Sequence, residues 1–178
     1  LRSLIVFEGR DLARLAGNMV LQDRLAADEP PVSPSVVPAW LGDPIAIKPP
    51  VAMLFRRQAG CNLLIVGQDE AAALGIETAA ILSLAAQEPS GANGARFVVL
   101  DFSLADSQQE GYLASLMGRL PHGSELVGRR HAAKAIEMVA AEVAQRMDAE
   151  DGSGAPVFLA IHGLMRARDL RPSDDLGG

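Results

Sequence analysis

The stretch LLIVGQDEAAALGIETAAILSLAAQ, residues 63–87, decides the fold class of this chain. Its apolar run ends at Gly67, and a longer segment rich in Ala, Leu and Ile follows. An unbroken apolar run bounded by turn residues is typical of a strand buried on both faces, so we expect a strand at 62–67 and a helix at 69–87. Strand, glycine and helix in this order are also the outline of a phosphate-binding loop.

The positions that give such a loop its chemistry hold unsuitable residues. The spacing G-x-x-x-x-G-K-[ST], counted from Gly67, places Ala72, Ala73 and Leu74 where a glycine, a lysine and a hydroxyl residue are required. The lysine supplies positive charge to the phosphate oxygens and the hydroxyl binds Mg²⁺, and neither role is open to Ala or Leu. The candidate nucleotide site consists of Gly67, Gln68, Asp69, Glu70, Ala71, Ala72, Ala73 and Leu74.

Two carboxylates occur where a phosphate would bind. Asp69 and Glu70 stand at the expected helix N-terminus, where the first backbone N–H groups have no partner within the helix. A carboxylate there accepts such hydrogen bonds and complements the helix dipole, so we expect Asp69 to cap the helix. The same negative charges would repel a triphosphate.

The composition is that of a globular chain with one core. The 178 residues are 49% hydrophobic and 21% charged, and the formal net charge of -6 argues against a nucleic-acid-binding surface over the whole chain. Cys61 is the only cysteine in the sequence, which excludes an internal disulfide and fits a reducing compartment. The first residues lack a signal-peptide pattern, and no apolar run reaches the ~18 residues of a membrane span, so we expect a cytoplasmic location.

Strand and helix patterns alternate along the rest of the chain. Besides 62–67, strands are expected at 4–9, 44–48, 95–101, 124–128 and 156–163. Helices are expected at 11–28, 51–58, 69–87, 108–120 and 129–150, and the proline-rich stretch 28–38 is expected to be a linker. Alternating strands and helices, with strands apolar throughout, imply an α/β fold with a mainly parallel sheet covered on both faces. We expect 62–67, 95–101 and 156–161 to be its neighbouring central strands.

The longest expected helix, 129–150, has apolar residues at helical spacing. We expect one side of this helix to face the sheet. That side consists of Ala133, Ile136, Val139, Ala140, Val143 and Met147.

Several short motifs, taken together, resemble the motor domain of the FtsK/SpoIIIE group within the HerA–FtsK branch of P-loop ATPases. WLGDPIAI and NLLIVG look like the lead-in to the Walker A loop, ARFVVLDFSLAD resembles the strand with the LID signature, and LPH follows at the expected place. AAEVAQRM is similar to the helix before Walker B, and PVFLAIHGLMRARDL stands where Walker B occurs. The resemblance covers residues 40–170.

This resemblance implies a three-layer RecA-like core of the P-loop NTPase type, with a mainly parallel sheet. It divides the chain into an N-terminal strand–helix segment with a proline-rich linker, 1–39, and an FtsK-like α/β domain, 40–178. It also implies that the C-terminal strands of the motor domain are missing, so we expect the chain to be a piece of a longer protein.

Two residues at strand ends complete the candidate site. His162 stands at the place of the Walker B aspartate, and Asp101 ends the strand 95–101. Because ligands of open α/β sheets bind beyond the carboxyl ends of the strands, we expect both to lie near Gly67. No Cys or second His lies at ligand spacing from His162, which favours a hydrogen-bonded strand-end histidine over a metal ligand. Asp101 is suited to cap the turn that follows it.

Two functions fit these residues. The favoured one is a non-catalytic scaffold or interaction module, with no cofactor and with other domains or subunits of a larger assembly as partners, further copies of the chain included. The alternative is an ATP-driven DNA translocase that uses ATP and Mg²⁺. Its backbone N–H groups at 68–72 would hold the ATP, with basic residues supplied from elsewhere, such as an arginine of a neighbouring subunit. The lost lysine alone removes a charge-assisted contact worth roughly 1.5–3 kcal/mol. The sequence leaves enzymatic activity open, and no membrane contact is expected.

Overall fold

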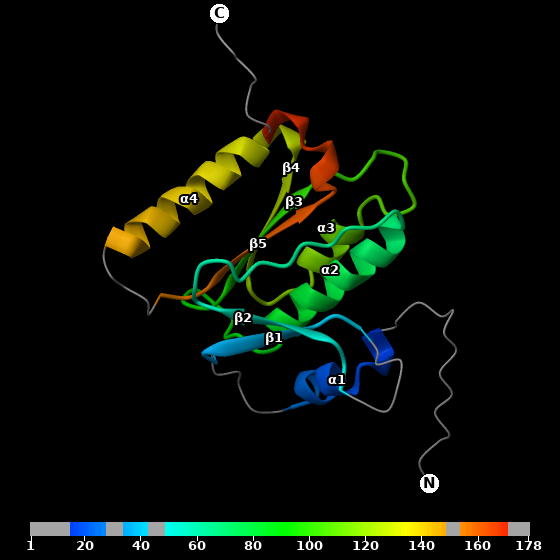
Figure 1. Ribbon diagram of the computed structural model, residues 1–178, viewed down its shortest axis with the longest axis vertical. Helices are drawn as coiled ribbons and strands as arrows, with labels where there is room; N and C mark the ends of the chain where they lie inside the picture. Colours follow the sequence, from blue (N-terminus) through cyan, green and yellow to red (C-terminus); the bar gives the residue numbers. More distant parts are fainter. Residues whose placement is uncertain (1–14, 28–33, 43–48, 149–153, 171–178) are drawn as a thin grey trace, which may run out of the picture. The chain divides into compact units, whose positions relative to one another are not determined.

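The computed structural model describes residues 15–27, 34–42, 49–148 and 154–170 (Figure 1). The chain divides into two compact units, Leu1–Pro89 and Ser90–Gly178. Both combine helices with strands and the second contains a parallel sheet, so the α/β class is confirmed. The strands expected at 4–9 and 44–48 lie outside the described residues.

In the first unit a short helix and a two-stranded sheet precede a long helix. The 3₁₀ turn η1 (Leu15–Gly17) leads into helix α1 (Met19–Leu25), whose N-cap Asn18 accepts a hydrogen bond from the Leu21 N–H at 3.1 Å. Strands β1 (Val36–Trp40) and β2 (Ala52–Arg56) pair antiparallel. Two predictions are therefore wrong: the linker 28–38 runs into a strand, and 51–58 contains a strand instead of a helix.

The hydrogen-bond pattern of this sheet explains why it accommodates Pro38. Leu41 N–H donates to the Val51 carbonyl at 2.9 Å, so the backbone groups of Pro38 and Trp40 point away from β2. A missing N–H costs nothing at such a position. β2 alternates between exposed and half-buried residues, which is the two-residue period of a strand with one covered face. The stretch 51–58 is too short for its sequence pattern to distinguish a strand from a helix, and pairing with β1 makes it a strand.

Helix α2 (Glu70–Ala85) confirms the helix expected at 69–87 and packs on β1. One side chain of α2 and one just beyond its C-terminal end also bond to the free edge of that strand. Ser83 Oγ accepts from the Trp40 N–H at 3.1 Å, and Gln87 Nε2 donates to the Pro38 carbonyl at 2.8 Å. These polar side chains take the place of a neighbouring strand, because they satisfy backbone groups that β2 does not reach.

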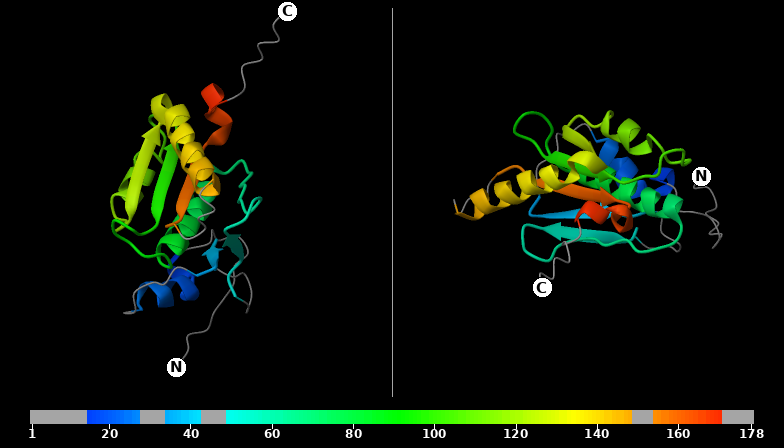
Figure 2. Two further views of the ribbon diagram at one scale, coloured as in Figure 1. Left: turned by 90° about the vertical axis from the view of Figure 1, so that its left-hand side faces the viewer. Right: turned by 90° about the horizontal axis from the view of Figure 1, so that it is seen from above.

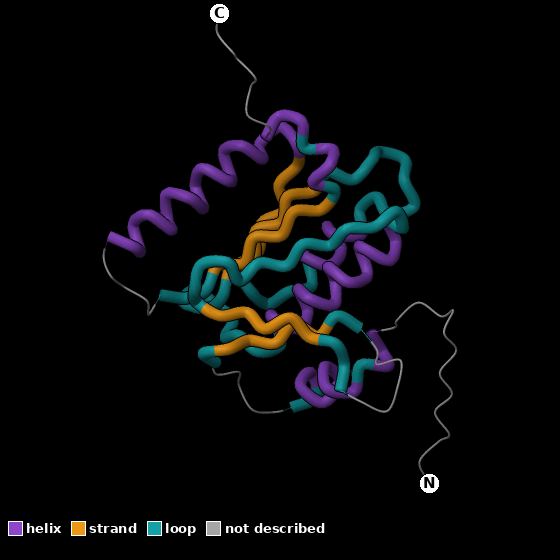
Figure 3. Tube along the Cα trace, viewed as in Figure 1, coloured by secondary structure: helices purple, strands orange, loops and turns teal. Residues whose placement is uncertain are grey.

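The predicted strand at 62–67 is wrong. This stretch belongs to the link between β2 and α2, which Figure 3 draws as a loop, and it pairs with no strand among the described residues. Leu64 is 74% exposed and Val66 is 86% exposed. An apolar run becomes a buried strand only where neighbouring strands bond to its backbone, and in the part of the chain that the structure describes no strand bonds to this run.

The second unit is built on a three-stranded parallel sheet with the order β4-β3-β5, which Figure 2 shows side by side. β3 (Arg96–Asp101) is central, flanked by β4 (Gly123–Gly128) and β5 (Val157–His162). The strands expected at 95–101, 124–128 and 156–163 are confirmed, and they are parallel. The expected central position of 156–161 is wrong, because within the described residues β5 pairs with β3 alone and forms an edge of this sheet.

Apolar residues cover both faces of β3, as the continuous run predicted. On one face Phe97 stacks on Phe158 at 5.2 Å between ring centroids and meets His122 edge-on at 5.3 Å. Helix α3 (Tyr112–Met117) falls within the helix expected at 108–120, and its Met117 carbonyl accepts from Ser124 Oγ of β4 at 3.2 Å. The other face belongs to a core cluster of Val98, Leu100, Phe102, Val127, Ala132, Ala135 and Ala167.

Helix α4 (Ala132–Asp148) follows the 3₁₀ turn η2 (Arg129–His131) and corresponds to the longest expected helix. The rotation of α4 about its axis differs from the prediction. Its buried residues are Ala132 and Ala135, and Ile136 and Val139 are partly buried against the core. Four residues expected to face the sheet are exposed instead: Ala133, Ala140, Val143 and Met147.

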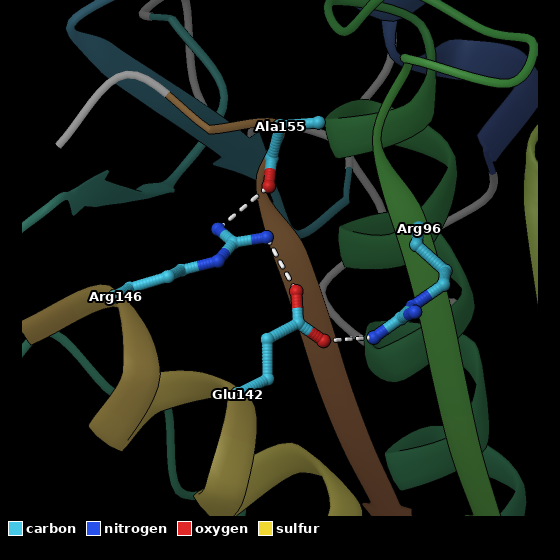
Figure 4. Close-up of polar contacts among 4 residues, drawn as sticks. All are labelled: Arg96, Glu142, Arg146 and Ala155. Carbon is cyan, nitrogen blue, oxygen red and sulfur yellow. Dashed lines mark hydrogen bonds and ion pairs between the residues drawn. The ribbon is translucent and has the colours of Figure 1, made fainter. Parts of the chain in front are cut away.

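Ion pairs accompany this rotation. Glu142 pairs with Arg96 of β3 and with Arg146 one turn along α4 (Figure 4). Arg146 Nη1 also donates to the Ala155 carbonyl just before β5, at 2.8 Å. The C-terminal half of α4 therefore turns its charged side to the sheet, and its apolar side faces outward.

Candidate functional site

The N-terminus of α2 is closed by its own cap residue. Asp69 has extended backbone angles, φ -89° and ψ 102°, and its Oδ1 accepts from the Ala72 N–H at 3.0 Å. The Asp69 carbonyl accepts from the Ala73 N–H at 3.0 Å, which is the first bond of the helix ladder. The predicted cap is thus confirmed. One of the N–H groups that a phosphate loop would aim at its ligand is already bonded to a carboxylate.

The residues around this cap do not have the geometry of a phosphate cradle. Gly67 is not among the glycines with a left-handed φ, and a Cβ built there meets no atom within 4 Å. Glycine is therefore not required at this position for a tight turn or a close approach. Leu74 is only 4% exposed and is a core residue, and Ala73 beside it is half-buried. A lysine and a hydroxyl at these two places would face a packed helix side.

Local charge also disfavours an anion at this end of α2. Asp69 is exposed, and Glu70 is an acidic residue of the first helical turn. Two negative charges complement the positive end of the helix dipole and oppose a further negative group. Between Cys61 and Gly75 the sequence contains no lysine or arginine to offset them.

The structure brings Asp101 and His162 together. They are register partners at the carboxyl ends of β3 and β5, and the Phe102 N–H donates to the His162 carbonyl at 3.1 Å. Asp101 Oδ1 accepts from the Ser103 N–H at 2.8 Å, so this carboxylate caps the turn after β3 as the sequence indicated. His162 is 4% exposed. Residues 67–74 belong to the other unit, so their expected proximity to this pair stays a prediction.

An arginine that the sequence analysis missed organises the turn after β5. Gly163 has φ +69°, and a Cβ there would lie 2.5 Å from Nη2 of Arg166 in the 3₁₀ turn η3 (Leu164–Arg166). Arg166 Nε donates to the Phe102 carbonyl at 2.6 Å, and Arg129 Nη2 donates to the Arg166 carbonyl at 3.4 Å. The guanidinium therefore joins the ends of β3 and β5. In the sequence, the one local sign of this contact is that Gly163 stands three residues before Arg166.

The Arg96–Glu142–Arg146 network was also missed. The pair Glu142–Arg146 could have been predicted from the sequence, because these residues have the i,i+4 spacing of a helical ion pair. The other half joins residues 46 positions apart, which only the packing of α4 on β3 brings together.

Metal-binding clusters and membrane-spanning helices are both absent from the described residues. Within them, no group of three or more His, Cys, Asp or Glu side chains is arranged as a metal site. Cys61 is a free, half-buried thiol. In the part of the chain that the structure describes, no helix has both the length and the apolar character to cross a bilayer.

Comparison with known proteins assigns no family. No protein-family model matches the chain, no curated protein is significantly similar to it, and no solved structure matches it. The function must therefore be argued from the residues and their geometry.

Proposed function

We propose that this chain is a degenerate ATPase domain of the FtsK/SpoIIIE type, with a RecA-like P-loop core, acting in the cytoplasm as a non-catalytic scaffold within a larger protein. The order of the motifs between residues 40 and 170 supports the family. The parallel order β4-β3-β5, with a helix between β4 and β5, is compatible with such a core.

The observation that carries the non-catalytic part is the cap of α2. Asp69 Oδ1 holds the Ala72 N–H at 3.0 Å, and Glu70 adds a second negative charge in the first turn. A nucleotide would have to displace the carboxylate and bind against both charges, with no lysine nearby in the sequence to neutralise its phosphates. We therefore expect the domain to contribute surfaces for other domains or subunits, and no ATP hydrolysis.

Titration calorimetry with ATP and Mg²⁺ tests this proposal directly. We expect no saturable heat at millimolar nucleotide, because the site lacks the lysine, the hydroxyl and the aspartate of a working motor. Saturable binding in the micromolar range would refute the scaffold proposal and support the alternative, an ATP-driven DNA translocase with an unorthodox nucleotide site.

Reconstruction of the motif gives a sharper test. The double variant Ala73→Lys, Leu74→Thr should not hydrolyse ATP, because His162 still replaces the Mg²⁺-binding aspartate and both carboxylates at 69 and 70 remain. Adding His162→Asp tests that last position. Circular dichroism must show that each variant is folded, since Leu74 is a core residue. Hydrolysis by the double variant at roughly 1 s⁻¹ or more, within the usual range of enzymes, would mean that the site was nearly intact.

A further inference from the structure

Basic side chains gather where the strands of the second unit end. The turn η2 follows β4, and the turns η3 and η4 (Arg168–Leu170) follow β5, so all three lie at the carboxyl edge of the parallel sheet. Figure 1 shows η3 and η4, in red, beside the first turns of α4. These turns and the start of α4 contribute the cations that we call the basic edge: Arg129, Arg130, Lys134, Arg166 and Arg168.

Packing and hydrogen bonds hold the parts of the basic edge together. Ala167, between Arg166 and Arg168, is 3% exposed and packs in one core cluster with Ala132 at the start of α4. Arg129 Nη2 donates to the Arg166 carbonyl at 3.4 Å, across 37 positions of sequence. The basic edge is therefore one surface, although its residues come from two distant segments of the chain.

The positive charge of the basic edge is not balanced within the described residues. Four of its side chains are exposed and form no ion pair there: Arg129, Arg130, Lys134 and Arg168. Asp169 is the one acidic residue in the sequence of 128–134 and 163–170. Asp101, at the end of β3, is half-buried and already accepts from the Ser103 N–H. Because the chain as a whole has a formal net charge of -6, this concentration of cations stands apart from the overall composition.

The start of α4 lacks the negative charge that a helix N-terminus favours. Gly128, the N-cap of η2, makes no side-chain hydrogen bond, and the first turns of η2 and α4 contain no acidic residue. Arg129, Arg130 and Lys134 occupy these turns instead, which places positive charges at the positive end of the helix dipole. A carboxylate from outside the chain would complement the dipole and the guanidinium groups together.

Two exposed apolar side chains lie beside these cations. Leu164 is 51% exposed and Met165 is 77% exposed, and both belong to η3 with Arg166. Exposed apolar side chains rimmed by polar groups mark protein-binding surfaces. A phosphate backbone has no apolar surface to cover them, and the sequence of 128–134 and 163–170 contains no Phe, Tyr or Trp on which nucleic-acid bases could stack. The combination of charge and apolar surface therefore favours a protein partner.

We propose that the basic edge binds an acidic segment of a partner protein, in which carboxylates stand next to large apolar side chains. Arginine clusters suit this ligand, because each guanidinium can donate two parallel hydrogen bonds to a carboxylate. The carboxylates lie against Arg130, Arg168 and the start of α4, and the apolar side chains cover Leu164 and Met165. This names the class of partner for the scaffold of the preceding section, and to that extent rests on it.

Fluorescence anisotropy with a labelled peptide tests the proposal. The probe consists of three Asp-Asp-Leu-Glu repeats, and the 178-residue chain is titrated into it at about 50 mM salt. We expect saturable binding with a dissociation constant on the order of 10–100 µM, as for a small, transient interface. Binding should weaken about tenfold at 0.5 M salt, because exposed charges are screened. A matched probe of Asp-Asp-Ser-Glu repeats has the same charge and should bind about fivefold more weakly, because it leaves the apolar side chains uncovered.

Charge reversal separates the basic edge from the rest of the unit. The double variant Arg130→Glu, Arg168→Glu should weaken peptide binding at least about tenfold, because it replaces attraction by repulsion. Arg119→Glu is the matched control: Arg119 is also exposed, but it precedes β4 and so lies toward the opposite edge of the sheet. This control should bind the peptide like the wild type.

A second pair of variants tests the apolar contact. Met165→Ser should weaken binding of the leucine probe to the level of the serine probe. Met147→Ser should leave both probes unaffected, because Met147 is similarly exposed, at 74%, but lies at the far end of α4. Circular dichroism confirms that each variant is folded.

Each result decides the proposal. It is overturned if the leucine probe does not bind saturably at low salt, or if the double charge reversal leaves binding unchanged. Tighter binding of a thymidine oligonucleotide or of phosphatidylserine vesicles than of the leucine probe would also overturn it, since the edge would then serve nucleic acid or a lipid surface. Equal binding of the two peptides would overturn the role of Leu164 and Met165. Failure in these experiments leaves the scaffold proposal to the calorimetry, and nucleotide binding there leaves the basic edge untouched.

Discussion

Replacing Asp69 by Ala removes the cap that closes the N-terminus of α2. The Oδ1 to Ala72 N–H bond of 3.0 Å is lost, and with it the favourable charge at the positive end of the helix dipole. Cap losses of this kind cost about 0.5–2 kcal/mol. Asp69 is exposed, so water solvates the freed N–H and we expect about 1 kcal/mol. For a cooperative unit of the length of Leu1–Pro89, that lowers Tm by about 4–8 °C.

Asp69→Asn separates the hydrogen bond from the charge. Asparagine caps helices about as well as aspartate, so this variant should lose only a few tenths of a kcal/mol, and less at high salt. Thermal and urea unfolding followed by circular dichroism measure both variants. The capping account fails if Asp69→Ala leaves Tm and the urea midpoint unchanged. It also fails if Asp69→Asn costs as much as Asp69→Ala, because the bond would then contribute nothing.

Four other substitutions have expected outcomes in the same unfolding assays. Gly75→Ala should raise stability by about 0.5–1 kcal/mol, because Gly75 lies inside α2 with open space around a new Cβ, and an unchanged or lower midpoint would contradict this. Leu74→Thr should cost about 2–5 kcal/mol, as for truncation of a buried leucine, and a loss below roughly 1 kcal/mol would show that the site is not core. Gly163→Ala should destabilise by at least about 1 kcal/mol, because of its φ of +69° and the Arg166 guanidinium beside it. Glu142→Gln should cost about 0.5–1 kcal/mol at low salt and less in 1 M salt, whereas a salt-independent loss would point to packing.

Features that depend on near neighbours in the chain were readable in advance. Asp69 was expected to cap α2, and it does so by bonding to a residue three positions on. Asp101 was expected to cap a turn, and its bond reaches Ser103, two positions on. The strand at β3 was equally clear, because its apolar run is bounded by a glycine-rich turn on one side and a carboxylate on the other. Such features are set by backbone geometry and by atoms within about one helical turn.

The predictions that were wrong concern segments whose structure depends on residues far away in the sequence. An unbroken apolar run led us to expect a central strand at 62–67, and we expected a helix at 51–58. Among the described residues the first stretch pairs with no strand, whereas the second contains β2, which pairs with β1. The candidate site was predictable only as a stretch of chain around Asp69 and, separately, as the ends of two strands. The contact of Asp101 with His162 required the register of β3 against β5.

The sequence by itself determined the α/β class, the extent and cap of α2, and the absence of lysine and hydroxyl side chains from the loop before it. Each of these follows from residue type or from contacts a few positions apart. Tertiary structure alone decided which apolar runs became strands and which side of α4 faces the sheet. A strand needs backbone partners from elsewhere in the chain, and α4 packs Ala132, Ala135, Ile136 and Val139 against the core, so the rest of its apolar residues remain exposed.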